Sequence, residues 1–510
     1  MKKDTRSLLA IFLIITVSLG CKLAVPQATP TIDNSSTPKA HPSYPTARST
    51  FTPLPTTAPV LTTTLPVSTQ APQPPQSTDP LSAGDPYSPE LGNSGYDVQK
   101  YNLKLALDPA TAFIDAAVTI TATSTIQIEQ VSLDFIGFDI EQITFLGQPV
   151  EYQRLANKLL VELPVVVPSG KEFVLEITYS GEPVIEASAY IPFVAHTGLI
   201  RPDDVSLYVE SEPDGSRYWF PCNDHPRDKA TFRFELTVPD GMTGVANGKL
   251  IGQPKAVPDA LPSGKDGELY IWEHNYPAAT AFVTVAVAKY ERVDGRSPKG
   301  IPLRSYIFPD QVERFQSYEN HIGEMIDWLS DQFGPYPFDE FGYVMVRGLG
   351  ASVETQTMVV LDEAMLNEEI LVHEMAHMWF GDWVSLDSWG DIWRSEGFAT
   401  YTQFLWAARD QPDQLEQTIL GIENFISDNP SGYPLNYPPR EEMFGSYSYI
   451  KGAVVAHALR EKMGDKAFFD GLRAYFKRYG GGVASHAQFQ AVMEEAAGIK
   501  LDEFFAKWFK

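Results

Sequence analysis

The sequence is poor in cysteine and in positive charge. Its 510 residues include only two cysteines, Cys21 and Cys222, so a framework of disulfide bonds is excluded. Lysine and arginine together number 39 against 65 aspartates and glutamates, which gives a formal net charge of −26. Because contact with a phosphate backbone needs a cationic surface, this balance argues against a nucleic-acid partner. It favours a soluble surface and a site that attracts cationic groups.

The N-terminus lacks an apolar run long enough for a comfortable membrane span. Three positive residues among the first six precede the short apolar run Leu8–Leu19, and this pattern predicts a signal peptide over residues 1–20. Gly20 before Cys21 resembles the lipobox of bacterial lipoproteins, in which the cysteine carries the lipid. We therefore expect an exported chain, anchored to a membrane through lipid on Cys21, at the cell surface or in the periplasm. An uncleaved N-terminal anchor and a plain secretory signal are the alternatives.

Residues 21–93 are rich in proline, threonine and serine and contain few large apolar side chains. Such a segment cannot bury enough apolar surface to offset the entropy lost on ordering. We expect a disordered, extended stalk that holds the folded part away from the membrane.

Two differently patterned regions follow the stalk. Over residues 94–298, short β-branched or alternating runs separated by Pro and Gly predict an all-β N-terminal domain, a β-sheet or saddle-like sandwich. Over residues 299–510 helical spacing dominates, as in ENHIGEMIDWLSDQF at 319–333, and FGYVMVRG at 341–348 is a strand candidate. The expected fold is multidomain, with an all-β domain followed by a mainly helical α+β domain.

The stretch HEMAH at residues 373–377 carries two histidines four residues apart. On a helix this spacing puts His373 and His377 on one face, one turn apart, so both imidazoles can bind one metal ion, usually zinc. Glu374 projects about 100° round the helix from His373. It can therefore reach a water on such an ion and act as a general base. A helix with two buried, hydrogen-bonded histidines is the structural alternative.

A catalytic zinc site needs a third protein ligand, and Glu396 in DIWRSEGFATY is the next candidate along the chain. Gly381 can end the first helix, and Asp387 or Ser388 can start another. A helix–loop–helix of this kind would bring Glu396 back towards the two histidines. Two histidines and one glutamate form a known catalytic zinc set.

The residues around these ligands carry a family resemblance. HEMAHMWFGDW followed by WRSEGFATY, with eighteen residues between His377 and Glu396, resembles the zinc aminopeptidases of the aminopeptidase N and leukotriene hydrolase type, the HExxH-x18-E gluzincins. SRYWFPCNDHPRDKATF at 216–232, YIFPDQVERF and FGPYPFDEF resemble further family segments. The resemblance runs from about residue 95 to the C-terminus. It implies a thermolysin-like catalytic domain, one bound Zn²⁺ ion, and a short form without the C-terminal domains of many members.

The resemblance also implies a role for each site residue. His373, His377 and Glu396 would bind the zinc ion, and Glu374 would take a proton from the zinc-bound water. Tyr449 lies in YIKG, which matches the family's Y-x-K-G segment, and would stabilise the oxyanion that forms. Ordinary core packing is the alternative for this tyrosine.

Selection of a free N-terminus needs negative charge close to the zinc ion. In ASVET, at residues 351–355, Glu354 stands at the glutamate of the family's G-x-M-E-N segment, although Ala351 and Val353 depart from that pattern. We expect Ala351, Ser352 and Val353 to line the bound substrate.

A second acidic segment, VESEPDGSR, precedes the WFPC block. It aligns Glu212 with another family acid and Glu210 with a family glutamine. Two carboxylates around one ammonium would favour removal of an N-terminal residue over internal cleavage. A solvated acidic loop is the alternative for Glu210 and Glu212.

Together these patterns predict a zinc-dependent aminopeptidase that hydrolyses the first peptide bond of peptides with a free N-terminus. They set neither the preferred N-terminal side chain nor an oligomeric state. The alternatives are a zinc metalloendopeptidase, a catalytically inactive surface lipoprotein that binds peptides, and a leukotriene-type epoxide hydrolase.

Overall fold

The computed structural model describes residues 79–111, 113–192, 194 and 196–509. The predicted signal peptide, the Cys21 anchor and most of the predicted stalk lie outside these residues. The described residues belong to one compact unit, 74–510.

The N-terminal region is built on a nine-stranded sheet in the order β13-β15-β11-β1-β2-β8-β4-β5, with β14 also paired to β15. Side chains of β1 and β2 alternate between buried and exposed positions, as expected for strands that cover a core with one face. Most neighbours are antiparallel, but β1 and β11 run parallel. The strands are β1 (Tyr96–Leu107), β2 (Ile114–Ser124), β4 (Asp139–Phe145), β5 (Gln148–Pro149), β8 (Glu172–Gly181), β11 (Lys229–Pro239), β13 (Lys249–Leu250), β14 (Lys255–Val257) and β15 (Gly267–Ala279).

Two smaller sheets complete this region, in the orders β12-β16-β10-β9 and β3-β7-β6. Their inward side chains share one apolar core with the large sheet. The predicted all-β N-terminal domain is therefore confirmed. The strands are β3 (Ile128–Asp134), β6 (Tyr152–Leu155), β7 (Lys158–Val167), β9 (Gly198–Asp203), β10 (Ser206–Glu210), β12 (Thr243–Ala246) and β16 (Val285–Ala288).

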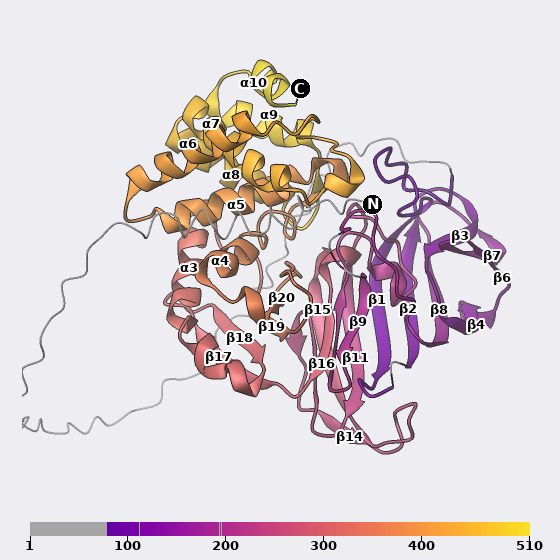
Figure 1. The fold of residues 1–510 in the computed structure, drawn as a ribbon. Coiled ribbons are helices and arrows are strands. Elements are labelled where there is room, and N and C mark those ends of the chain that lie inside the picture. Colours follow the sequence, from indigo (N-terminus) through magenta and orange to yellow (C-terminus); the bar gives the residue numbers. More distant parts are fainter. Residues whose placement is uncertain (1–78, 112, 193, 195, 510) are drawn as a thin grey trace, which may run out of the picture. The chain divides into compact units, whose positions relative to one another are not determined.

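The C-terminal region combines a four-stranded sheet, β17-β18-β19-β20, with most of the helices (Figure 1). Its sheet begins at Glu291, so the change between regions comes before the boundary that the sequence suggested at residue 298. The predicted helix over 319–333 and the strand in FGYVMVRG are both present. The strands are β17 (Glu291–Arg296), β18 (Pro302–Ile307), β19 (Tyr343–Val346), β20 (Val359–Asp362), β21 (Ser385–Leu386) and β22 (Val483–Ala484).

The helices of this region pack around a second apolar core. In Figure 1 α5 to α10 gather on one side of the four-stranded sheet, so the mainly helical α+β domain is also confirmed. Among the described residues no helix is both long and apolar enough to cross a membrane. The helices are α2 (Val312–Gln316), α3 (Glu319–Phe333), α4 (Glu368–Ala376), α5 (Trp393–Ala407), α6 (Pro412–Asp428), α7 (Gly452–Met463), α8 (Asp465–Tyr479), α9 (His486–Ala497) and α10 (Asp502–Trp508).

Residues 79–93, which composition alone assigns to the stalk, lie against both regions in the structure. We call this segment the strap. Asp85 accepts hydrogen bonds from the Ser388 hydroxyl at 3.0 Å and from the His225 ring at 3.2 Å. Glu90 pairs with Arg440 at 2.7 Å. The strap therefore links the β region, through His225, to the helical region, through Ser388 and Arg440.

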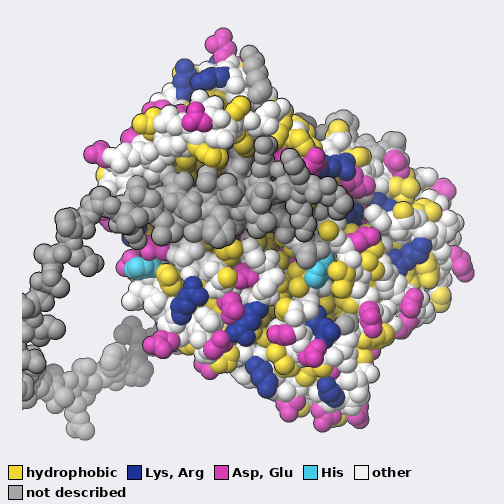
Figure 2. Space-filling view, in the orientation of Figure 1, with side chains coloured by type: hydrophobic (Ala, Val, Ile, Leu, Met, Phe, Trp, Pro, Cys, Tyr) yellow, Lys and Arg dark blue, Asp and Glu magenta, His cyan; other side chains and the backbone are white. Residues whose placement is uncertain are grey.

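Aspartates and glutamates are spread over the face seen in Figure 2, with fewer lysines and arginines among them. No large cationic patch lies on the described part of that face.

Candidate zinc centre and substrate site

The helix α4 positions the two histidines of HEMAH. Asn367 directly precedes it, and its side chain accepts a hydrogen bond from the Ile370 amide and so caps the helix. It ends with His377 as its last residue of helical conformation, at φ −60° and ψ −22°. His373 and His377 are both buried, and their rings lie one turn apart with centroids separated by 4.9 Å.

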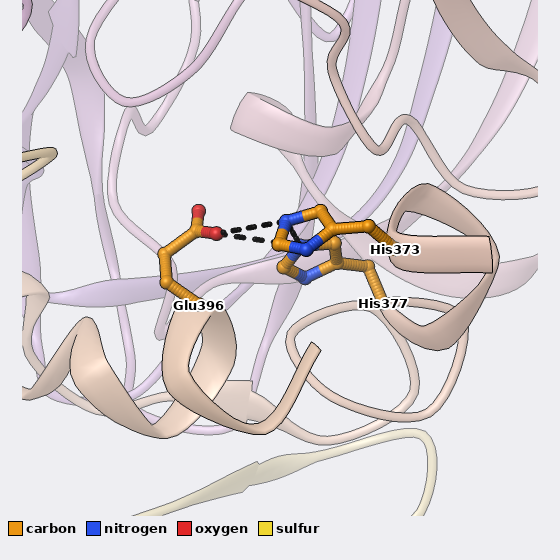
Figure 3. Close-up of side chains that lie close together, drawn as sticks. All are labelled: His373, His377 and Glu396. Carbon is orange, nitrogen blue, oxygen red and sulfur yellow. Dashed lines mark hydrogen bonds and ion pairs between the residues drawn. The ribbon is translucent and has the colours of Figure 1, made fainter. Parts of the chain in front are cut away.

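The third ligand candidate, Glu396, lies in the first turn of α5. Ser388 caps the short helix before it by accepting a hydrogen bond from the Gly390 amide, as its sequence position predicts. Figure 3 shows the three side chains converging. His373 Nε2 lies 3.2 Å from His377 Nε2 and 3.3 Å from Glu396 Oε2, and His377 Nε2 lies 3.5 Å from that oxygen.

The donor set fits a zinc ion. His377 Nδ1 lies 3.1 Å from the Phe380 carbonyl and 3.0 Å from the Ser395 hydroxyl. Because a carbonyl can only accept, Nδ1 carries a proton, which leaves Nε2 as the nitrogen that would bind a metal ion. Two imidazoles, one of them fixed from behind, together with one carboxylate, are the arrangement that catalytic zinc sites use.

The charges of the site favour a cation. Burial works to lower the pKa of His377, but the carboxylates of Glu354 and Glu396 raise it to about 10. Burial works to raise the pKa of Glu396, but His377 and the hydrogen bonds from both histidines hold it at about 2. The carboxylates therefore stabilise a positive charge in this buried site, whether it is carried by an imidazole or by a metal ion.

Glu374 and Tyr449 border the ligand set. Glu374 is buried, and its Oε2 makes no hydrogen bond. Burial and the nearby Glu354 raise its pKa well above the usual range of a glutamate. Tyr449 lies in a turn of π-helix, Tyr447–Lys451, and its ring centroid is 6.0 Å from that of His373. A proton acceptor and a phenol donor thus stand beside the metal position.

A second cluster of carboxylates adjoins the ligands. Glu212, Glu354 and Glu396 each contribute an oxygen, and these oxygens lie within 4.8 Å of one another. Glu354 Oε1 also lies 3.3 Å from His377 Nδ1. Burial, together with the neighbouring carboxylates, raises the pKa of Glu212 well above its usual range. A bound cation would relieve the repulsion among three buried carboxylates so close together.

The segment 351–355 reaches the site along the edge of the catalytic sheet. Val353 and Val360 of β20 exchange backbone hydrogen bonds at 2.9 Å in both directions, which makes the segment an added antiparallel edge. Ala351 and Ser352 are half-buried, and Ser352 Oγ has no hydrogen-bond partner. The edge therefore presents Glu354 inwards towards Glu212.

Glu210 lies behind these carboxylates. Its Oε2 accepts a hydrogen bond of 2.5 Å from the Thr197 hydroxyl, and the residue is buried. Burial raises its pKa to about 8, although the Thr197 bond opposes the shift. A buried, protonated Glu210 has the same shape as glutamine and can likewise donate a hydrogen bond.

Sequence reasoning gave no role to Asp382, which directly follows Gly381 in the HEMAHMWFGDW motif. Both of its carboxylate oxygens are buried and have no hydrogen-bond partner. Burial first, and then the charge of Glu354, raise its pKa well above the usual range. The motif contained this aspartate, but only the fold shows that its chain turns back towards His377, whose carbonyl accepts from the Asp382 amide at 3.1 Å.

Comparisons with known proteins agree with this reading of the fold. A family model described as the peptidase M1 N-terminal domain matches residues 98–260, and one described as the peptidase family M1 domain matches 320–508. Aminopeptidase N of Streptomyces lividans is 27% identical over 422 residues, covering 74% of this chain and 45% of that protein. The chain thus spans less than half the length of the curated relatives it matches, down to 33% for human glutamyl aminopeptidase.

Solved structures match over nearly their whole length. An M1 zinc metallopeptidase from Deinococcus radiodurans is 30% identical, with a TM-score of 0.76 over 84% of this chain and 96% of that chain. A mutant of that enzyme bound to a Tyr-Ser-Ala substrate gives a TM-score of 0.74 at 29% identity over 84% of this chain and 97% of that chain.

Fold and site together are those of a zinc metallopeptidase, a hydrolase that uses a bound zinc ion. Within that class the chain belongs to peptidase family M1. Its zinc cofactor and the resemblance seen in its motifs are therefore confirmed. The individual roles of the site residues stay predictions.

Proposed function

We propose that this protein is an aminopeptidase that removes the N-terminal residue from peptides. The observation that carries the proposal is the meeting of Glu212 and Glu354 beside Glu396 and the two histidines. Glu212 Oε1 and Glu354 Oε1 are buried and lack hydrogen bonds. A protonated peptide N-terminus would donate to both and offset their charge, and such charge-assisted bonds are among the stronger ones in proteins.

The residues around the ligands supply the remaining functions. When bound to His373, His377 and Glu396, zinc supplies a Lewis acid and lowers the pKa of water. The carboxylate of Glu374 accepts a proton from the attacking water and delivers it to the leaving amine. The Tyr449 phenol donates a hydrogen bond where negative charge develops on the peptide carbonyl oxygen.

An internal peptide bond fits this site less well. In an endopeptidase the chain would place a neutral amide where Glu212 and Glu354 converge, leaving two buried carboxylates without a positive partner. Such uncompensated charge costs several kcal/mol. The Tyr-Ser-Ala substrate of the Deinococcus radiodurans enzyme is a short peptide, which agrees with cleavage near an N-terminus.

The experiment that tests this function joins metal analysis to a substrate panel. The purified protein should hold one zinc ion per chain and release the chromophore from aminoacyl chromogenic amides. Removal of zinc with a chelator should abolish that release, and one equivalent of zinc should restore it. A zinc-loaded protein that hydrolyses none of the panel would refute the proposal.

We also propose that the enzyme acts outside the cytoplasm while attached to a membrane. The support lies in the sequence, where the charged and apolar N-terminal pattern ends at Gly20 and Cys21. A Cys21→Ser variant should move from the membrane fraction to the soluble fraction. Equal membrane partitioning of this variant and the parent would count against a lipid on Cys21.

A further inference from the structure

A second cluster of metal-ligating side chains lies away from the HEMAH site, between α6 and α7. Glu416 comes from α6, while His457 and Glu461 lie four residues apart on α7. One ligand atom from each of the three residues lies within 4.8 Å of the others. From this geometry we propose that Glu416, His457 and Glu461 form a second divalent metal site, independent of the catalytic zinc.

The histidine is held as a metal ligand would be. His457 is only 6% exposed, although the cluster itself opens to solvent through its carboxylates. Its Nδ1 lies 3.2 Å from the Tyr401 hydroxyl. That oxygen already accepts a hydrogen bond from Arg460 and can accept the Nδ1 proton as well. Such a bond from the far side of the ring leaves the Nε2 lone pair free for an ion.

The near side of the ring faces the carboxylates without a proper hydrogen bond. His457 Nε2 lies 3.7 Å from Glu416 Oε2, which is longer than a hydrogen bond. A ring nitrogen that faces a carboxylate from beyond hydrogen-bonding distance leaves room for an ion that both would bind. The spacing of four residues between His457 and Glu461 puts both side chains on one helix face, as two ligands require.

The cluster also lacks the usual competitor of a metal ion. Within the described residues, neither Glu416 nor Glu461 forms an ion pair with a lysine or arginine. Arg460, the neighbour of Glu461 in the chain, bonds both carboxylate oxygens of Asp465 at 2.9 Å. The two carboxylates therefore have no lysine or arginine partner that would compete with a metal ion.

The ligand types indicate the class of ion. One imidazole and two carboxylates suit a divalent transition metal such as Mn²⁺ or Zn²⁺ better than Mg²⁺, which prefers oxygen ligands and its own water. Water would complete the coordination, because both glutamates are exposed. A bound ion would join α6 to α7, the helix that continues directly from the turn carrying Tyr449.

The test is a titration of the zinc-loaded protein with Mn²⁺, followed by electron paramagnetic resonance of free Mn²⁺. We expect the parent to bind one Mn²⁺ per chain. We expect Glu461→Gln and Glu416→Gln each to weaken that binding at least tenfold, and the double variant to abolish it. Glu423→Gln, which changes an exposed glutamate of α6 outside the cluster, is the matched control and should bind like the parent.

Two further readouts keep the test decisive. The catalytic zinc content should stay at one per chain in all these variants, because none of them touches a HEMAH-site residue. Added Mn²⁺ should raise the melting temperature of the parent and of Glu423→Gln, but not of the double variant. Equal Mn²⁺ affinity in the parent and the double variant, or no binding by the parent, would overturn the proposal whatever the enzyme hydrolyses.

Discussion

At the scale of single residues, the site separates metal binding from proton transfer. His373, His377 and Glu396 face one another at 3.2 to 3.5 Å, whereas Glu374 keeps a free buried oxygen. Because the two tasks belong to different side chains, each can be removed without the other. This separation gives the most direct test of the role proposed for Glu374.

Glu374→Gln should keep its zinc and lose its activity. The amide has nearly the shape of the carboxylate but cannot accept a proton, so kcat should fall about 10³-fold, within the range usual for loss of a general base. Zinc per chain, measured on the same preparation, should stay at one. A variant with zinc and near-parental kcat would exclude Glu374 as the base.

Glu354→Gln should act on binding of the substrate's amine. Removing one of the two charges that face a free N-terminus should raise KM for aminoacyl amides at least tenfold, since a charge-assisted hydrogen bond contributes about 1.5–3 kcal/mol. The effect should be smaller for a substrate whose N-terminus carries no charge. Steady-state kinetics with both kinds of substrate check this, and an equal change for the two would contradict an amine-binding role.

At the scale of elements, the strap and strand β15 each carry a stability prediction. The strap is tied down by buried polar contacts of Asp85, which pairs with His225 and accepts from Ser388. Tyr87 and Leu91 add apolar contacts to a small core shared with Trp389.

Asp85→Ala should therefore destabilise the folded protein by about 3 kcal/mol, because it leaves a buried histidine without its partner. Denaturant unfolding of the full chain measures the change in the free energy of unfolding. Pro86→Ala, at an exposed position of the strap next to Asp85, is the comparison and should cost far less. If both substitutions had the same small effect, the strap would not join the two regions.

His274 of β15 should make stability depend on pH. It is fully buried and bonds Gln356, and burial lowers its pKa from 6.5 to about 4. The fold therefore disfavours the protonated ring, so this contribution is complete above pH 6.5 and is lost as pH falls towards 4. Each pKa unit corresponds to about 1.4 kcal/mol, so the total is on the order of 3 kcal/mol.

The matching measurement compares unfolding of the parent and of His274→Gln between pH 7 and pH 4. Glutamine can still donate to Gln356 but has no charge to gain. The stability of the variant should fall less steeply over this window than that of the parent. Parallel curves would mean that His274 does not titrate in the fold as described.

At the scale of the whole molecule, local sequence patterns predicted some features of the fold and site, whereas the other features depend on tertiary contacts. The spacing of His373 and His377, and the cap at Ser388, are properties of short segments, so the sequence suffices for them. The β and helical regions likewise follow from side-chain periodicity. These features are retained in the fold because each depends only on residues that are close together in the sequence.

Other features depend on residues far apart in the chain. The approach of Glu354 to His377 joins the edge of a sheet to a helix, and family resemblance, not spacing, suggested it. The strap resembles the stalk in composition because its ordering comes from His225 and Arg440, more than 100 residues away. The Glu416, His457 and Glu461 cluster likewise arises only when α6 packs on α7.

The central claim is that this zinc site binds the free N-terminal amine of its peptide substrate and requires it. Its most direct test is one assay in which the zinc-loaded protein meets a short peptide and the same peptide acetylated at its N-terminus, with products identified by mass spectrometry. The account predicts release of the first residue from the free peptide and at least 100-fold slower cleavage of the acetylated one. Equal cleavage of both, or cleavage at an internal bond, would contradict it.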